Sequence, residues 1–241
     1  VVDGAYLRQK GIPVSNIPAY STGAVAQLVF AFLTAFTNRV ALHSEAVHAG
    51  EWSRCPDFCF WKAPLAELAG KTLGIIGFGG IGQKVADIAA AFDMHVLAVS
   101  GHETDQSARK NFQWTTLEDL AAQSDFITLH CPLNEKTENL VDAAFLSRCK
   151  PTAYLINTAR GPVVDAAALA DALNEGRLAG AGLDVLTTEP PADDNPLLHA
   201  KNCLITPHIA WAGFETRARL MSILKENFAA FAKGTPIHVV N

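Results

Sequence analysis

Residues 73–82 read LGIIGFGGIG, and this segment is the strongest indication of the fold class. Its apolar first half fits a buried strand, and its second half has the spacing G-x-G-x-x-G that opens a helix. The first glycine permits a tight turn, the second lets the backbone approach a pyrophosphate, and the third lets helix and strand pack closely. Free amide groups at the start of the helix would face that anion. The positions expected to line it are Gly77, Gly79, Gly80, Ile81 and Gly82.

The alternation of strand and helix continues after this turn. Apolar segments of strand length recur, and we predict strands at 72–76, 95–99, 125–130, 153–157, 179–183 and 203–206. Helical segments lie between most of them, at 81–91, 117–122, 143–149 and 165–174. Continuous apolar strands interleaved with helices indicate a parallel sheet covered on both faces. The predicted fold class is α/β, with a Rossmann-type doubly wound parallel sheet.

The segments around this core are less regular. Residues 22–48 predict one long, largely buried helix, and the aromatic, proline-containing stretch 50–64 predicts an irregular arm that covers an apolar surface. A contact between two copies of the chain is the favoured use of such an arm, so we expect a homodimer. A last helix at about 211–232 ends before Gly234, and residues 1–20 are typical of the end of another unit.

Composition narrows the function classes. The net charge of −5 and the 49% hydrophobic content fit a folded globular protein and give no basic surface for nucleic acid or anionic membranes. The longest apolar stretch, 24–36, is too short to span a bilayer. Five scattered cysteines favour reduced thiols in the cytoplasm, and no histidine–carboxylate spacing suggests a metal site. The absence of an initiator Met at Val1 suggests that something precedes the chain.

Three polar side chains, Arg160, Glu189 and His208, each follow a different predicted strand. Because the carboxyl ends of parallel strands meet at one edge, where open α/β sheets bind ligands, we expect the three to share one crevice. A guanidinium grips a carboxylate through two parallel hydrogen bonds, and an imidazolium donates a proton near neutral pH. A carboxylate beside the histidine favours its charged form. The set suits reversible reduction of a 2-keto acid.

Each residue also has an ordinary structural explanation. Arg160 could cap a strand end or pair with Asp165, and Glu189 could be a solvated charge. Trp211 could be a packing residue at the start of a helix.

The form of a bound dinucleotide is open. The acid that binds the adenosine ribose is expected about 20 residues after the glycine turn, at the end of the second strand. That position is Ser100, and the first carboxylate after it is Glu103. A carboxylate would repel the 2′-phosphate of NADP, whereas a serine can donate to a hydroxyl or to a phosphate. No arginine occupies 101 or 102, so NAD and NADP both stay possible.

From about Asp3 to Asn241 the chain resembles the D-isomer-specific 2-hydroxyacid dehydrogenase family. The resemblance rests on several motifs, namely the 77–82 turn, HCPL at 130–133 with Thr137, NTARG at 157–161, residues 184–190 and TPHIA at 206–210. The arm at 52–62 and Trp211 are most similar to glycerate dehydrogenase (hydroxypyruvate reductase) members.

The resemblance implies residue roles. Arg160 would hold the substrate carboxylate, His208 would be the acid and base, and Glu189 would be its partner. Asp184 would contact the nicotinamide carboxamide, and Trp211 would line the substrate end. The cofactor would also be bordered by Ser100, Cys131, Thr137, Thr158 and Ala159.

The resemblance also implies a domain organisation. Residues 1–21 would be a remnant of a flavodoxin-like substrate domain, and 208–241 would return to it. Residues 22–207 would form the dinucleotide-binding domain, with an interdomain helix and dimer arm at 22–64. The front of the substrate domain, which in the family supplies a loop that helps hold the substrate carboxylate, would then be missing from this sequence.

Three functions compete. The leading hypothesis is an NAD(P)-dependent oxidoreductase acting on hydroxypyruvate/D-glycerate or glyoxylate/glycolate. The alternative is a dinucleotide-sensing dimeric interaction protein of the same fold, like the corepressor relatives of the family. A third hypothesis is an inert product of truncation.

Overall fold

The computed structural model describes residues 2–241, and within them the chain divides into two compact units. The residues up to Ala24 and Ile209–Asn241 form one unit, and Val25–His208 form the other. The first unit contains the short helix α1 (Gly4–Gln9) and the long helix α8 (Phe214–Ala232), with the two ends of the chain joined by a bridge between Ser15 and Val239.

The larger unit is built on a seven-stranded, fully parallel sheet. The strand order is β3-β2-β1-β4-β5-β6-β7, so the direction of winding reverses between β1 and β4. The strands are β1 (Thr72–Ile76), β2 (His95–Val99), β3 (Phe112–Trp114), β4 (Phe126–Leu129), β5 (Tyr154–Asn157), β6 (Gly180–Leu183) and β7 (Cys203–Ile205). The predicted Rossmann-type sheet is therefore confirmed, and a ligand crevice is expected where the winding reverses.

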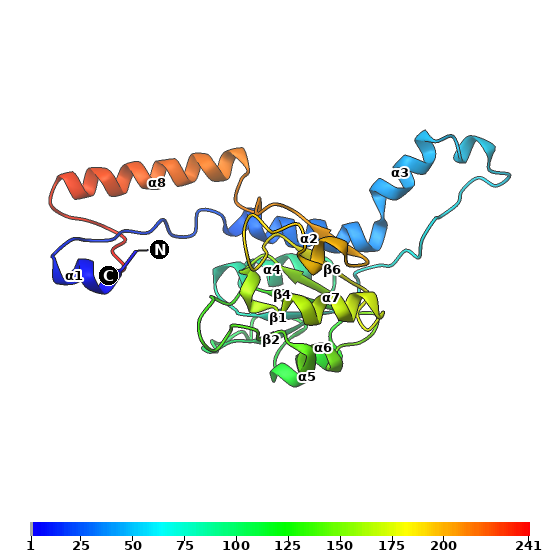
Figure 1. Cartoon of the computed structure of the whole chain (residues 1–241), viewed down its shortest axis with the longest axis horizontal. Coiled ribbons are helices and arrows are strands. Elements are labelled where there is room, and N and C mark those ends of the chain that lie inside the picture. Colours follow the sequence, from blue (N-terminus) through cyan, green and yellow to red (C-terminus); the bar gives the residue numbers. More distant parts are fainter. Residues whose placement is uncertain (1) are drawn as a thin grey trace. The chain divides into compact units, whose positions relative to one another are not determined.

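Helices cover both faces of this sheet. One apolar core joins the sheet to α2 (Thr22–Asn38) and α4 (Gly80–Ala91), and a second joins it to α5 (Leu117–Gln123), α6 (Ala143–Arg148) and α7 (Ala166–Asn174). In Figure 1, α2 and α6 lie on opposite sides of the sheet. Burial of this apolar surface, at roughly 1.5–3 kcal/mol for each large side chain, is the main term that holds the layers together.

Two strand glycines set how closely the helices approach. A Cβ atom on Gly182 would lie 2.6 Å from the Phe32 ring of α2, and one on Gly74 would lie 2.6 Å from Leu120 of α5. A side chain at either position would push a helix off the sheet, so the tight layering depends on glycine there.

Three details differ from the sequence expectations. The single helix predicted for 22–48 is wrong, because Arg39 adopts a left-handed backbone (φ 49°) that separates α2 from α3 (Val40–His48). The last helix begins at Phe214, after Gly213, and not at Trp211. Strand β3 was not predicted, because its three residues are too few to show a period and it is held by pairing with β2.

Among the described residues, no single helix is long and apolar enough to cross a bilayer. Helices α2 and α3 meet these two criteria only when taken together, and the chain bends by 53° between them. The five cysteines are free thiols.

Candidate active site

The glycine turn between β1 and α4 has the geometry of a phosphate cradle. Gly77 has φ 95°, and a Cβ there would lie 2.5 Å from the backbone nitrogen of Cys131. A Cβ on Gly82 would lie 2.3 Å from the carbonyl oxygen of Gly77. Gly79 and Gly80 instead face open space, because an added Cβ would have no atom within 4 Å besides those of the adjoining backbone. Side chains at these two positions would fill the space that a pyrophosphate needs at the amino end of the helix.

The next loops supply walls for a dinucleotide. After β4, the Thr137 hydroxyl donates to the Pro132 carbonyl (2.6 Å) and accepts from the Asn134 amide (2.9 Å), which closes this loop. Burial raises the pKa of the Cys131 thiol, so it presents a neutral surface. After β5, Thr158 is buried and its hydroxyl has no hydrogen-bond partner within the described chain. A buried hydroxyl that lacks a protein partner is free to form a hydrogen bond with a polar group of a ligand.

Ser100 ends β2, where the ribose is expected. Its hydroxyl oxygen accepts a hydrogen bond from the His102 amide (3.3 Å), which leaves the hydroxyl hydrogen available as a donor. The residue is half-buried. The Ser100 hydroxyl can therefore donate a hydrogen bond to a hydroxyl or a phosphate oxygen of a ligand, and it is not suited to bind a cation.

Glu189 and His208 are in direct contact although 19 residues separate them. His208 Nδ1 lies 2.6 Å from Glu189 Oε2, and the Leu186 amide donates to Oε1 at 3.0 Å. The backbone of His208 is fixed too, because its amide donates to the carbonyl of Asp184 (2.8 Å) and its φ is 54°. A histidine in this uncommon conformation is held there by its surroundings, and such positions concentrate at functional sites.

A pocket of about 620 Å³ adjoins this pair. Its wall includes Asp184, Leu198, Ile205 and Pro207 besides the pair itself. Asp184 is 1% exposed, and the Thr206 hydroxyl donates to its Oδ1 at 2.6 Å. The pocket therefore combines apolar walls with a few placed polar groups, as small-molecule sites do.

Arg160 lies on the neighbouring loop. A Cβ on Gly161 would lie 2.0 Å from the carbonyl carbon of Leu186, so the Arg160 loop rests directly on the loop that carries Glu189. The Arg160 side chain is exposed, and its guanidinium donates to the carbonyl of Ala159 (2.7 Å) and not to Glu189 or His208. The loops therefore adjoin, while the guanidinium itself stays apart from the histidine–carboxylate pair. Trp211 belongs to the other unit and is 36% exposed.

Two contributors were missed by sequence reasoning. Thr206 holds the carboxylate of Asp184, and the Leu186 amide holds that of Glu189. The role of Thr206 could have been predicted from its position directly before Pro207-His208. The role of the Leu186 amide could not, because every residue except proline has a backbone amide.

The comparisons with known proteins agree on one family. Residues 30–210 match the model described as D-isomer specific 2-hydroxyacid dehydrogenase, NAD binding domain. A hydroxypyruvate reductase of Blautia hydrogenotrophica is 47% identical, over all of this chain and 75% of the relative. Among solved structures, an acyclic imino acid reductase in complex with NADPH and D-Arg is 37% identical (TM-score 0.87, 99% of this chain and 74% of that one). D-lactate dehydrogenase from Aquifex aeolicus, complexed with NAD and lactic acid, is 33% identical (TM-score 0.87, 97% and 73%).

Proposed function

The chain belongs to the D-isomer specific 2-hydroxyacid dehydrogenase family, and on that premise we propose that it reduces hydroxypyruvate or glyoxylate to the corresponding 2-hydroxy acid. It is an oxidoreductase that uses a nicotinamide dinucleotide. The observation that carries the proposal is the contact between Glu189 and His208 at the carboxyl edge of the sheet, beside a pocket of suitable size.

His208 is the proposed acid and base. Glu189 occupies Nδ1, which leaves Nε2 to donate a proton to the carbonyl oxygen of the keto acid during reduction and to take it back during oxidation. The carboxylate contacts Nδ1 and thereby fixes the plane of the ring. Bound nicotinamide dinucleotide supplies the hydride for the carbonyl carbon.

Arg160 is the proposed anchor of the substrate carboxylate. Its exposed guanidinium holds a single carbonyl, so donors remain for a bidentate pair. The contact of Gly161 with Leu186 supports placing this anchor beside the acid–base pair. Trp211 is proposed to border the substrate end, and residues 2–21 with 208–241 are proposed to belong to a substrate domain.

The dinucleotide is proposed to lie along Gly77, Gly79, Gly80, Ile81 and Gly82, with Ser100 at the ribose and Cys131, Thr137, Thr158, Ala159 and Asp184 toward the nicotinamide. Ser100 places no negative charge against a 2′-phosphate, so we propose that NADH and NADPH both bind. Changing Ser100 to Asp should then weaken NADPH binding selectively, as measured by titration with each form.

We further propose a homodimer formed through α3 and the arm that follows it. Phe58 is 88% exposed, Trp61 69% and Trp52 52%, which is unusual for side chains of this size. The five free thiols fit a reducing compartment such as the cytoplasm. The net charge of −5 supports small-molecule partners and not nucleic acid or anionic membranes.

The test is an assay of the full chain. NADH or NADPH oxidation should follow the addition of hydroxypyruvate or glyoxylate, with pyruvate as a comparison. Cofactor binding without turnover of any 2-keto acid would overturn the proposed reaction.

A further inference from the structure

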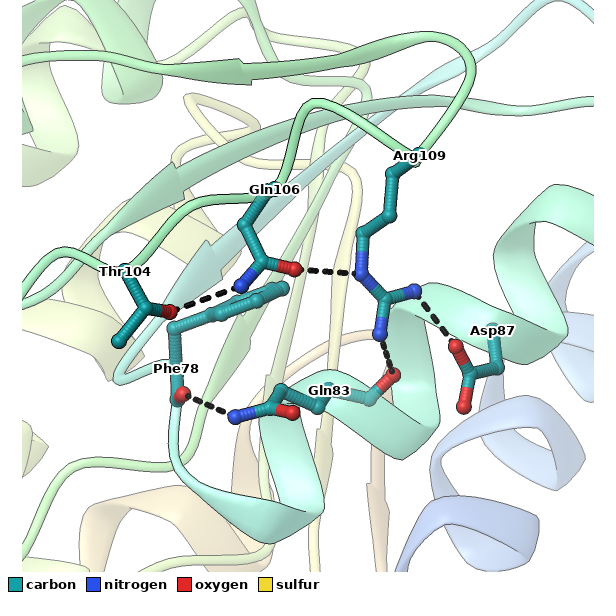
Figure 2. A network of polar contacts seen from close by, with 6 residues as sticks. All are labelled: Phe78, Gln83, Asp87, Thr104, Gln106 and Arg109. Atoms are coloured by element: carbon teal, nitrogen blue, oxygen red, sulfur yellow. Dashed lines mark hydrogen bonds and ion pairs between the residues drawn. The ribbon is translucent and has the colours of Figure 1, made fainter.

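Arg109 joins helix α4 to the loop after β2, two segments between which the chain forms strand β2 (Figure 2). Nη1 of its guanidinium contacts Oδ1 of Asp87 at 2.5 Å, and Nη2 donates to the carbonyl of Gln83 at 3.5 Å. Both partners belong to α4. The Nε–H donates to the side-chain oxygen of Gln106 at 2.7 Å, within the loop that follows β2. All three guanidinium nitrogens are therefore engaged, between one helix and one loop.

The guanidinium also lies over the glycine turn. Its carbon is 5.6 Å from the centre of the Phe78 ring, and Phe78 stands between the first two glycines of the turn. That ring is 5% exposed and packs edge-on against Trp114 (5.1 Å). The Gln83 side chain also binds the turn, because its amide nitrogen donates to the Phe78 carbonyl at 3.3 Å. The arginine is thus bound to both the helix and the turn that opens it.

The loop on the other side is ordered by the same network. Gln106 donates from its amide nitrogen to the Thr104 hydroxyl at 2.8 Å, and the Trp114 indole donates to the Thr104 carbonyl at 3.2 Å. This loop begins at Ser100, so its fold sets where the end of β2 presents its hydroxyl. Figure 2 shows the chain of contacts running from Thr104 through Gln106 and Arg109 to Asp87.

We propose that Arg109 is a positioning residue for the adenosine diphosphate half of the cofactor. Ribose and pyrophosphate are covalently joined, so the end of β2 and the glycine turn must keep a fixed separation to bind both. Arg109 fixes the distance between the end of β2 and the glycine turn, because it binds the loop after Ser100 through Gln106 and contacts the turn through Phe78 and α4. Arg109 is not among the residues that line the pocket beside Glu189 and His208. The inference rests on the proposed placement of the dinucleotide.

A lysine can replace Arg109 only in part. An ammonium group keeps the charge toward Asp87, but it lacks the planar fork that reaches three partners and stacks on a ring. The proposed role of Arg109 therefore depends on the planar shape of the guanidinium as well as on its charge.

The test compares ligands that share only the adenosine half. ADP-ribose and NADH are titrated against the full chain and against Arg109→Met, Arg109→Lys and Asp87→Asn. We expect Arg109→Met to raise both dissociation constants about tenfold, which corresponds to about 1.4 kcal/mol. Arg109→Lys should recover part of that loss, and Asp87→Asn should cause a smaller one. At saturating cofactor, kcat and the KM of the keto acid should change less than about twofold.

A matched control is Arg177→Met, because Arg177 forms an exposed ion pair with Glu175 (2.6 Å) away from this network. It should alter none of these constants. If folded Arg109→Met binds ADP-ribose as tightly as the unmodified chain, the inference is overturned. It is also overturned if kcat or the KM of the keto acid worsens by as much as the dissociation constants do. If the unmodified chain binds neither NADH nor NADPH, the proposed function fails instead.

Discussion

Glu189 uses its two carboxylate oxygens for different partners, and the one that faces His208 lies 2.6 Å from Nδ1 while the other accepts from the Leu186 amide. The carboxylate is therefore fixed before any substrate arrives. A preset partner orients the imidazole at little entropic cost, which is what an acid–base group needs.

Removal of this pair should reduce turnover. We expect His208→Ala to lower kcat by about 10²- to 10⁴-fold, the usual contribution of a positioned acid–base group. Glu189→Gln should lower kcat less, because the imidazole remains but loses the carboxylate that orients it. Steady-state kinetics with hydroxypyruvate measures both, and NADH titration is the control. Full activity of His208→Ala would contradict the assignment.

Arg160 should act through substrate affinity. Losing a bidentate pair to a carboxylate costs about 1.5–3 kcal/mol, so Arg160→Ala should raise the keto-acid KM by roughly 10- to 100-fold. Arg160→Lys should restore only part, since an ammonium makes no planar fork. The dissociation constant of NADH should stay the same. A normal KM in both variants would show that another group holds the carboxylate.

Gly161 should tolerate no side chain. A Cβ there would meet the Leu186 carbonyl carbon at 2.0 Å, and backbone cannot yield as a flexible side chain does. We expect Gly161→Ala to lower the free energy of unfolding by about 1–3 kcal/mol and to reduce kcat by shifting the Glu189 loop. Denaturant unfolding and kinetics measure the two effects. Gly23→Ala, whose added Cβ has no neighbour within 4 Å, is the control and should be neutral.

His130 should make the fold sensitive to acid. The residue reaches the surface in part, but its Nδ1 is buried without a partner in the described chain, and Nε2 lies 2.9 Å from the Thr128 hydroxyl. Burial lowers its pKa from 6.5 to about 3. Between these values the unfolded chain binds a proton that the folded chain refuses, so stability falls as pH drops below 6.5 and the loss is complete near 3.

The expected slope is about 1.4 kcal/mol per pH unit for one proton. Urea unfolding of the unmodified chain and of His130→Gln, from pH 7 to 4.5, measures this difference. The variant should lose less stability over that range, and parallel pH curves would show that the ring titrates normally.

The aromatic arm should govern association. Phe58 and Trp61 are among the most exposed large side chains of the larger unit, and a standard interface gains most from such anchors. We expect the double change Phe58→Ser with Trp61→Ser to convert a dimer to a monomer in sedimentation experiments. Leu133→Ser, at an exposed residue on another loop, is the matched control. A monomeric unmodified chain would contradict the proposed dimer.

The parallel sheet and its glycine turn could be predicted from the amino-acid sequence. Strands such as β4 and β6 are buried throughout, so their sequences are almost entirely apolar, with Thr128 the one polar residue of β4. The turn at 77–82 needs glycines at fixed spacing, and that spacing can be recognised in the sequence. These features are local, because each depends on residues adjacent in the chain.

Other features of the fold and of the site became visible only in the folded structure. The break at Arg39 and the three-residue strand β3 depend on packing and on pairing with distant segments, which local patterns do not encode. The network around Arg109 was also invisible, since Asp87 and Gln106 meet it only after α4 and the β2 loop have packed together. Polar contacts of this kind act over a few ångströms between residues far apart in sequence, and only folding brings them within reach.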